Sequence, residues 1–415
     1  MVALACGLGG AMAGTASAHK HRRDHHPSTP PATLFVSAAA KSTNSGQSCP
    51  TASYSTIQSA VNAAAAGANV IVCPGTYHEQ VVIQNPINLI GNSATIDEAG
   101  VTPGLTLTIP GIGPLQIDAG VVVLSSQVSI RGFTVQNAFG EGILAAGLAS
   151  TLNKVTIEGN EVVNDNKGGP PASTYFECQV NNQVPGDCGE GIHFINVAWS
   201  VIAGNHVSGN AGGILLTDET GPTHDNLITG NIITGNLFDC GITAPGHNPN
   251  ALSSTGQRQP SVAGVYNNKI IGNVITGNGV LGEGAGVLFA NAQAGTASYN
   301  NVVEHNYIAG NELAGVTMHA HTLAPGQFED LSGNTVTDNV IGVNNTGGDP
   351  LDGSATDNQT TGVLVFSGGT PIQTTIADNV IFGDEIGIWL SKPVSAAGLP
   401  SNSFFGVTAQ VSANN

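Results

Sequence analysis

Apolar and polar residues alternate in short runs along most of the chain, and many of these runs end at a Gly-Asn pair. Residues 200–217 show the pattern, with SVIAGN, HVSGN and GILLT in close succession. A period of two is expected of a strand buried on one face, and the abundant Val, Ile and Thr favour strands over helices. The pattern predicts three short strands per repeat, with corners at Gly and Asn, which tolerate positive φ angles.

The spacing inside the repeat is constant, while the distance between repeats varies. An Asn is followed five residues later by Asn or Asp at positions 205 and 210, 231 and 236, 273 and 278, 306 and 311, 334 and 339, and 379 and 384. Successive repeats lie between 26 residues (Asn205 to Asn231) and 45 residues (Asn334 to Asn379) apart. Constant units separated by loops of free length indicate a solenoid. Its stacked rungs would align the asparagines in columns whose side-chain amides bond to one another.

One helix is predicted ahead of the repeats, in the segment YSTIQSAVNAAAAGANVIVCPGTYHEQVVIQNPINLIG, residues 54–91. Ser55 and Gln58 match a capping box, and Gly67 stands where a glycine typically ends a helix. The apolar face of this helix consists of Ile57, Ala60, Val61 and Ala64. Such a helix would close the open end of the stack, where strand edges and core side chains would otherwise be exposed.

This segment and the repeats resemble the right-handed parallel β-helix, or pectin lyase-like, superfamily over roughly residues 33–395. The resemblance implies an all-β fold, a right-handed parallel β-helix solenoid with an N-terminal amphipathic capping helix, and a role connected with carbohydrates. It carries over no catalytic residues, because the chain does not show the motifs of pectin methylesterases, polygalacturonases or pectate lyases. The chemistry has to be inferred from the residues themselves.

The flanking segments predict export. Residues 1–18 are interpreted as a signal peptide whose start lies upstream, residues 19–32 as a disordered His- and Pro-rich linker, residues 33–395 as one β-helix domain whose cap and first coil reach residue 100, and residues 396–415 as a C-terminal tail or cap. No membrane span is expected, and the protein is predicted to be secreted. Cys49 with Cys73, and Cys178 with Cys188, are plausible disulfides, while Cys240 is expected to be a buried apolar residue.

The charge restricts the partners. A net charge of −18 argues against nucleic-acid binding and against unaided binding of polyuronates. A neutral polysaccharide, or an acidic one bridged by Ca²⁺, fits better. Asp349, Asp352 and Asp357 could bind Ca²⁺ or form a solvated acidic loop, and no other cofactor is expected. The oligomeric state is left open.

Long insertions flank the strands that begin Gly-Ile or Gly-Val, so these strands are predicted to form the floor of a groove walled by loops. The insertions are residues 164–189, 246–263, 319–329 and 345–361. The residue after each glycine should face the core, so the next residue should face outward. This alternation places His193, Thr243, Thr317 and Trp389, among others, on the outer face.

Two acidic residues occupy equivalent positions in FGEGI (139–143) and CGEGI (188–192). Glu141 and Glu190 should therefore lie on neighbouring rungs, about 4.8 Å apart. Carboxyl groups at that separation suit a retaining glycosidase, with one of them raised into the general-acid range by the other. The alternative is two turn residues that diverge into solvent.

A His-rich group is expected near the same groove. It consists of His193, His247, His319 and His321, with Asp218 and Asp239 within a few rungs. A neutral imidazole beside a carboxylate can act as a general base, whereas no compact ligand spacing supports a metal site. Each histidine could equally be an ordinary surface or hydrogen-bonding residue.

The hypothesis from sequence is a secreted carbohydrate-active enzyme: a glycoside hydrolase, transglycosidase or polysaccharide lyase. Glu190 would be the acid/base, Glu141 its partner, and His193, His319 and Asp239 the supporting groups. Substrate binding is assigned to Trp389 as a stacking platform, with His247, His321, Asp218, Asn291 and Tyr175. The alternative function is a non-catalytic β-helix: a surface adhesin, a carbohydrate-binding module, or a relative of the periplasmic copper-processing proteins.

Overall fold

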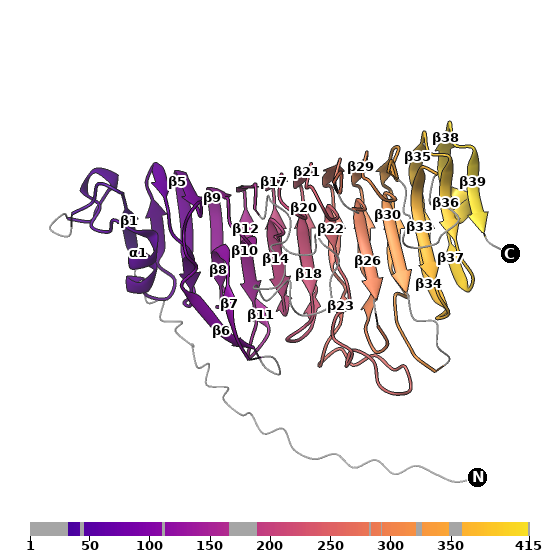
Figure 1. Cartoon of the computed structure of the whole chain (residues 1–415), viewed down its shortest axis with the longest axis horizontal. Coiled ribbons are helices and arrows are strands. Elements are labelled where there is room, and N and C mark those ends of the chain that lie inside the picture. Colours follow the sequence, from indigo (N-terminus) through magenta and orange to yellow (C-terminus); the bar gives the residue numbers. More distant parts are fainter. Residues whose placement is uncertain are drawn as a thin grey trace, which may run out of the picture. The chain divides into compact units, whose positions relative to one another are not determined.

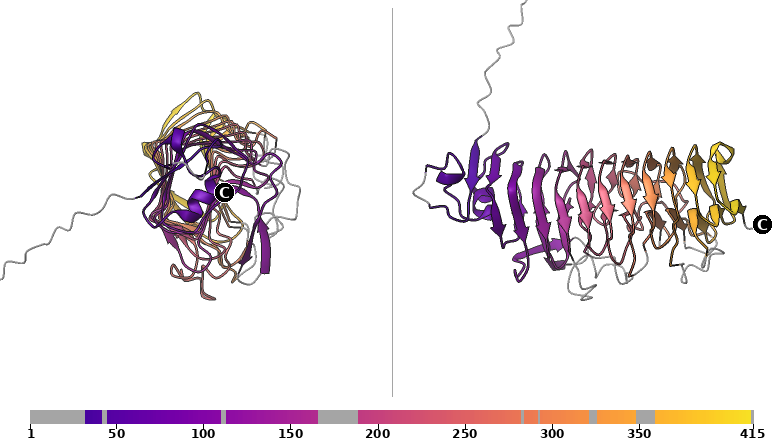
Figure 2. Two further views of the ribbon diagram at one scale, coloured as in Figure 1. Left: turned by 90° about the vertical axis from the view of Figure 1, so that its left-hand side faces the viewer. Right: turned by 90° about the horizontal axis from the view of Figure 1, so that it is seen from above.

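The computed structural model describes residues 32–41, 45–109, 113–165, 189–281, 284–291, 293–320, 326–347 and 359–413. Short strands wind into one elongated stack, and the described residues contain a single α-helix, α1 (Ile57–Ala63), near the N-terminal end of the stack (Figure 1). Seen along the axis, successive coils superimpose (Figure 2). The strand ladders of the stack are parallel, which confirms the predicted parallel β-helix. Among the described residues, no helix is long and apolar enough to cross a membrane.

One sheet has 11 strands and carries the outward column named above. Its strands are β4 (Val81–Ile83), β8 (Ala119–Val123), β10 (Glu141–Ala146), β14 (Ile192–Ile195), β18 (Ile214–Thr217), β22 (Ile242–Thr243), β26 (Val287–Asn291), β30 (Val316–Ala320), β33 (Thr361–Ser367), β36 (Ile386–Leu390) and β39 (Ala409–Ala413). The stack thus continues past residue 395, where the sequence pattern fades because Asn402 follows Ser401 rather than a glycine and no Gly-Asn pair comes after it.

The second sheet contains 21 strands and supplies two short strands to most coils. They are β1 (Thr33–Val36), β2 (Asn69–Val72), β3 (Gly75–Tyr77), β5 (Asn88–Asp97), β9 (Ser129–Gln136), β12 (Thr156–Glu158), β13 (Glu161–Val163), β16 (Val201–Ala203), β17 (His206–Ser208), β20 (Leu227–Thr229), β21 (Ile232–Thr234), β24 (Lys269–Ile271), β25 (Val274–Thr276), β28 (Val302–Glu304), β29 (Tyr307–Ala309), β31 (Thr335–Thr337), β32 (Val340–Ile341), β34 (Ile372–Ala377), β35 (Val380–Phe382), β37 (Val394–Ala397) and β38 (Ser403–Phe405).

A third, narrow sheet joins the other two, and the alternation pattern did not predict it because its strands have only two residues. It consists of β11 (Leu152–Asn153), β15 (Val197–Ala198), β19 (Thr223–His224), β23 (Val265–Tyr266) and β27 (Ser298–Tyr299). An antiparallel hairpin, β6 (Leu105–Ile109) and β7 (Gly113–Ile117), and two 3₁₀ turns, Cys49–Thr51 and Leu399–Ser401, complete the described elements.

Asparagine side chains form the predicted columns along the axis. In the middle of one column, Asn231 Nδ2 donates to Asn273 Oδ1 (2.9 Å) and to the carbonyl of Ile202 (3.0 Å). Asn231 Oδ1 accepts from both the backbone N–H and the side chain of Asn205 (2.9 and 3.0 Å). The three columns are Asn160, Asn205, Asn231, Asn273, Asn306, Asn339, Asn379 and Asn402; Asn210, Asn236, Asn278, Asn311 and Asn344; and Asn226, Asn268, Asn301 and Asn334.

Each half of a Gly-Asn pair has its own role. Gly204 and Gly230 have φ angles of 60° and 64°, which L-residues with side chains rarely adopt, so the glycine makes the corner and the asparagine forms the column. A different constraint explains the glycine that opens each strand of the groove sheet. A Cβ added to Gly191 would lie 2.8 Å from Asn210 Nδ2 and 2.4 Å from a Val207 methyl carbon, so the column leaves no room for a side chain.

The N-terminal helix forms, but both of its expected ends are wrong: the N-cap lies one residue later, and the helix ends at Ala63 with C-cap Ala64, so Gly67 belongs to the following turn. Thr56 is the N-cap, and its hydroxyl accepts from the N–H of Ser59 (3.2 Å). The Glu79 carboxylate accepts from the N–H groups of Ile57 and Gln58 (2.7 and 2.9 Å). A residue 21 positions downstream therefore takes the place of the local capping box. The Cys49–Cys73 disulfide is present and Cys240 is buried, as predicted, whereas Cys178 and Cys188 lie outside the described residues.

Replacing Asn231 by Ala is expected to destabilise the fold by about 2–3 kcal/mol, because it leaves the buried Asn205 N–H without its acceptor and removes the amide hydrogen bonds to Asn273 and Ile202. Chemical denaturation measures the change. The matched control is Asn250→Ala in an exposed loop, which should cost far less. Equal losses for the two variants would mean that the columns do not stabilise the stack.

The second column ends at an aspartate. Asp384 Oδ1 accepts from the Asn344 N–H (2.9 Å), while its buried Oδ2 has no hydrogen-bond partner within the described residues. Burial raises the pKa of Asp384 to about 7. Between pH 3.8 and about pH 7 the Asp384 carboxyl therefore stays protonated in the folded protein, whereas it is ionised in the unfolded chain. The free energy of unfolding consequently falls as the pH rises through that window.

We expect Asp384→Asn to stabilise the protein by roughly 1–3 kcal/mol at pH 8, and the gain to shrink toward pH 4, because an amide continues the column without a buried charge. Thermal unfolding across this pH range measures it. Asp378→Asn, at an exposed position on the same coil, is the control and should show no such pH dependence. A gain that is constant with pH would contradict the assigned titration.

Candidate active site

Backbone register confirms that the predicted column faces away from the core. His193 pairs with Leu215, Leu215 with Thr243, and the ladder continues through Leu288, Thr317, Leu364 and Trp389. The residues on either side of each position, such as Ile192 and Phe194, belong to the main core. The column is nevertheless buried rather than open: His193 is 2% exposed and Trp389 1%.

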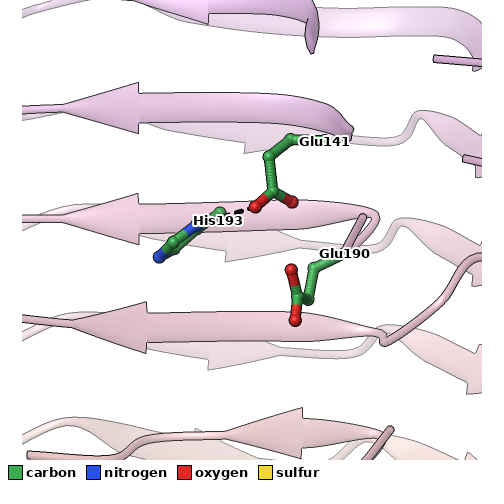
Figure 3. Close-up of side chains that lie close together, drawn as sticks. All are labelled: Glu141, Glu190 and His193. Atoms are coloured by element: carbon green, nitrogen blue, oxygen red, sulfur yellow. Dashed lines mark hydrogen bonds and ion pairs between the residues drawn. The ribbon is translucent and has the colours of Figure 1, made fainter. Parts of the chain in front are cut away.

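Glu141, Glu190 and His193 form a compact buried cluster on neighbouring coils (Figure 3). Ile143 pairs with Ile192, which places Glu141 and Glu190 at equivalent positions as predicted. One side-chain N or O atom from each of the three residues lies within 4.8 Å of those of the others. Glu141 and Glu190 are 0% and 1% exposed, so the alternative in which they diverge into solvent is wrong.

His193 is held through both ring nitrogens. Nδ1 lies 2.9 Å from Glu141 Oε1, and Nε2 lies 2.9 Å from the Thr217 hydroxyl. A carboxylate only accepts, so an ionised Glu141 requires a proton on His193 Nδ1.

A second pair of a histidine and a carboxylate lies on the following coils. Glu219 Oε1 lies 2.6 Å from His247 Nδ1. Burial alone would raise the pKa of Glu219, but the charge of His247 and its hydrogen bond outweigh burial and hold this pKa at about 2. The Glu141–His193 and Glu219–His247 pairs each join two neighbouring coils. Sequence spacing could not reveal them because their members are far apart along the chain.

Asp218 is fully occupied by the backbone, so its predicted role in substrate binding is not supported by its geometry. Its Oδ1 accepts from the N–H groups of His247 and Asn248 (2.7 and 3.0 Å), and its Oδ2 from that of Gly264 (2.7 Å). Burial, assisted by the charge of Glu219, raises the pKa of Asp218 to about 7. The side chain anchors both ends of the loop between residues 246 and 264.

A third carboxyl group adjoins the cluster at a gap in the ladder. A Cβ added to Gly212 would lie 3.0 Å from Glu190 Cγ and 3.4 Å from Asp239 Oδ2, so both side chains border the space that this glycine leaves. Burial raises the pKa of Asp239, which accepts from the Thr243 hydroxyl at 3.4 Å. The structure thus brings Asp239 beside Glu190, as the sequence predicted.

Other predicted site residues lie elsewhere. His319 is on β30, four strands from His193 on β14, or roughly 19 Å at about 4.8 Å per strand. Trp389 packs against Ala314 and Leu364, so its ring has no open face for a sugar. Asn291 is fully buried at the end of β26. His321 and Tyr175 lie outside the described residues, as do Asp349, Asp352 and Asp357.

Among the described residues, two groups of side chains could hold a metal ion, whereas the sequence suggested a metal only for Asp349, Asp352 and Asp357. One is the Glu141, Glu190 and His193 cluster, and the other is Glu304, His305 and Asp338 on the surface. The ligands of the first group come from different coils, which is why no short linear motif indicated them. Two carboxylates and an imidazole are ligands that several divalent cations accept.

Comparisons with known proteins agree on the fold. Residues 119–253 match the family model described as a right handed beta helix region. A search of curated proteins finds no match. The handedness implied by the resemblance is therefore supported, and the fold is a right-handed parallel β-helix.

Solved structures with similar architecture include three proteins of different kinds. The Dettilon tailspike protein is 14% identical, with a TM-score of 0.48 over 85% of this chain and 63% of the tailspike. The mannuronan C-5 epimerase A-module of Azotobacter vinelandii is 14% identical (TM-score 0.48; 86% and 94% covered), and pectate lyase Pel9A is 15% identical (TM-score 0.46; 90% and 78%). This chain spans under two thirds of the tailspike. At these values none of them assigns a residue role to this chain.

Above pH 5, Glu219→Gln is expected to be less stable than the wild type, and this difference should disappear on acidification. Folding lowers the pKa of Glu219 from 4.5 to about 2. Its contribution to the free energy of unfolding is therefore present above pH 4.5 and is lost as the pH falls from 4.5 toward 2. Denaturation at pH 7, 4 and 3 should show a difference of roughly 3 kcal/mol that narrows with acid. Glu158→Gln, exposed on the second sheet, is the control. A difference that widens on acidification would refute the ion pair.

Proposed function

We propose that this protein is a secreted carbohydrate-active enzyme that cleaves glycosidic bonds with retention of configuration, using Glu141 and Glu190. One observation carries the proposal: two buried carboxyl groups on adjacent coils, with side-chain atoms within 4.8 Å of each other and of His193. Retaining glycosidases place their two carboxyl groups about 5–5.5 Å apart, whereas inverting enzymes need a wider gap to admit water. The resemblance to the pectin lyase-like superfamily supports carbohydrate as the substrate class.

The environment differentiates the two carboxyl groups. Glu141 is hydrogen-bonded to His193 at 2.9 Å, and a donor at this distance favours the ionised form that a nucleophile needs. A carboxylate so close favours the protonated form of Glu190, which suits a general acid. Glu190 would protonate the leaving oxygen while Glu141 attacks the anomeric carbon. Glu190 would then take a proton from water as water releases the sugar from Glu141.

His193 has a positioning role in this scheme. Both of its ring nitrogens are engaged, by Glu141 and by Thr217, so it orients the nucleophile and does not itself take a proton from substrate. This differs from its predicted role as a base at the groove floor. The Thr217 hydroxyl fixes the ring orientation from the other side.

A non-catalytic carbohydrate-binding protein is the second candidate, and the burial of the cluster favours it. Glu141 and Glu190 do not reach solvent in this conformation, so turnover requires that the segments covering them open. In the non-catalytic case the same contacts would serve only to join neighbouring coils.

Glu190→Gln and Glu141→Gln should each lower glycan cleavage by about 10²–10⁴-fold, since each removes a group that acts in the transition state. Release of reducing ends from a panel of neutral polysaccharides measures the rate, and NMR of the first product gives the anomeric configuration. Glu161→Gln, exposed on the second sheet, serves as the control. Undiminished turnover in Glu190→Gln, or an inverted product, would exclude the mechanism. Absence of cleavage by the wild type would favour the non-catalytic candidate.

A further inference from the structure

Trp199 is a large aromatic residue on the surface that the proposed active site does not use. Its side chain is 63% exposed, in contrast to the 1% of Trp389, which the sequence pattern had favoured as a stacking platform. It follows β15 on the same coil as His193. Burial of the indole therefore cannot be the reason for a tryptophan at this corner.

The backbone at this corner makes the tryptophan costly. Trp199 has a φ of 52°, and the register places it in a column of left-handed residues with φ between 53° and 58° at the other coils. Those coils carry Lys154, Asp225, Asn267 and Asn300. Asn and Asp tolerate this conformation, whereas a bulky aromatic residue is strained in it. A strained residue that also leaves its apolar surface in water indicates a function outside the fold.

The ring of Trp199 is oriented along the stack. His224, Tyr266 and Tyr299 stack from coil to coil, with ring centroids 4.8 and 5.0 Å apart and interplanar angles of 7° and 13°. Their planes therefore lie roughly across the axis. The Trp199 ring stands at 84° to His224, 6.0 Å away, so its plane contains the axial direction. An extended polymer that follows the stack would therefore run parallel to the plane of this exposed ring.

Hydrogen-bonding groups surround the indole. The five corner residues Lys154, Trp199, Asp225, Asn267 and Asn300, here called the Trp199 strip, follow one another at the spacing of the coils. Lys154, Asn267 and Asn300 are exposed, and the Asp225 carboxylate is fixed by His224 Nδ1 at 2.7 Å. One positive and one negative side chain leave the strip without net charge. Donors and acceptors around one aromatic platform fit a hydroxylated, uncharged ligand better than an apolar protein surface.

We propose that the Trp199 strip is an accessory site that holds a strand of neutral polysaccharide along the axis, with a pyranose ring stacked on Trp199. The choice of a carbohydrate rests on the proposed function, but the site is separate from Glu141 and Glu190. Because Trp199 and His193 share a coil, a polymer held here is kept beside the groove sheet. The strip would raise the local concentration of polymer without contributing to bond cleavage.

Affinity electrophoresis of the full chain through gels containing glucomannan, xyloglucan or galactomannan, with polygalacturonate as the charged comparison, tests the proposal. At least one neutral polymer should retard the wild type. Trp199→Asn should weaken that retardation at least tenfold while its Tm stays the same or rises, since Asn suits the left-handed corner. Tyr307→Ala, which removes an exposed aromatic ring from the second sheet, should be retarded like the wild type.

Two further comparisons separate this site from the catalytic proposal. Glu190→Gln should keep the retardation, and Trp199→Asn should keep the rate of cleavage of a short soluble oligosaccharide. If no neutral polymer retards the wild type, if Trp199→Asn is retarded equally, or if polygalacturonate binds better than every neutral polymer, the inference is wrong. If Glu190→Gln loses cleavage but is still retarded by the polymer, the result supports a binding site that is separate from the catalytic residues.

Discussion

Hydrogen bonds between buried asparagine amides hold successive coils in register, and every other feature depends on that register. Each amide in the middle of a column donates to the next coil and accepts from the previous one, so a shift of one coil would break several bonds at once. Strand pairing alone specifies register weakly when neighbouring strands have similar sequences. The columns make the alignment specific, and the loops between coils can then vary in length at little cost.

The cluster of Glu141, Glu190 and His193 is a consequence of this alignment. Residues 49 positions apart become neighbours because their strands occupy the same place on consecutive coils. Two adjacent carboxyl groups repel each other, and the fold accommodates them by hydrogen-bonding one to His193 and by leaving a gap at Gly212 beside the other. Asp218, which holds the loop between residues 246 and 264, and the Glu219–His247 pair stabilise the next coils. The cluster of Glu141, Glu190 and His193 therefore packs against well-ordered neighbours.

The repeat spacing was sufficient to predict the fold, the columns and the proximity of Glu141 to Glu190, because all three depend only on the equivalence of positions between coils. The same reasoning failed where contacts depend on loops or on the separation between coils. Trp389 faces outward as predicted but is covered, and His319 shares the groove sheet with His193 but lies four strands away. The strain at Trp199 could not be seen in the sequence, because alternation reports which face a residue occupies and not its φ angle.

The central claim is that Glu141 acts as a nucleophile beside the acid Glu190. Incubation with 2-deoxy-2-fluoro glycosides, followed by mass spectrometry of the digested protein, tests it most directly, because such substrates trap the covalent intermediate of a retaining enzyme. The account predicts one sugar attached to the peptide that contains Glu141, and no adduct in the Glu141→Gln variant. A sugar attached to another residue, or an unlabelled protein that still cleaves the natural glycan, would contradict it.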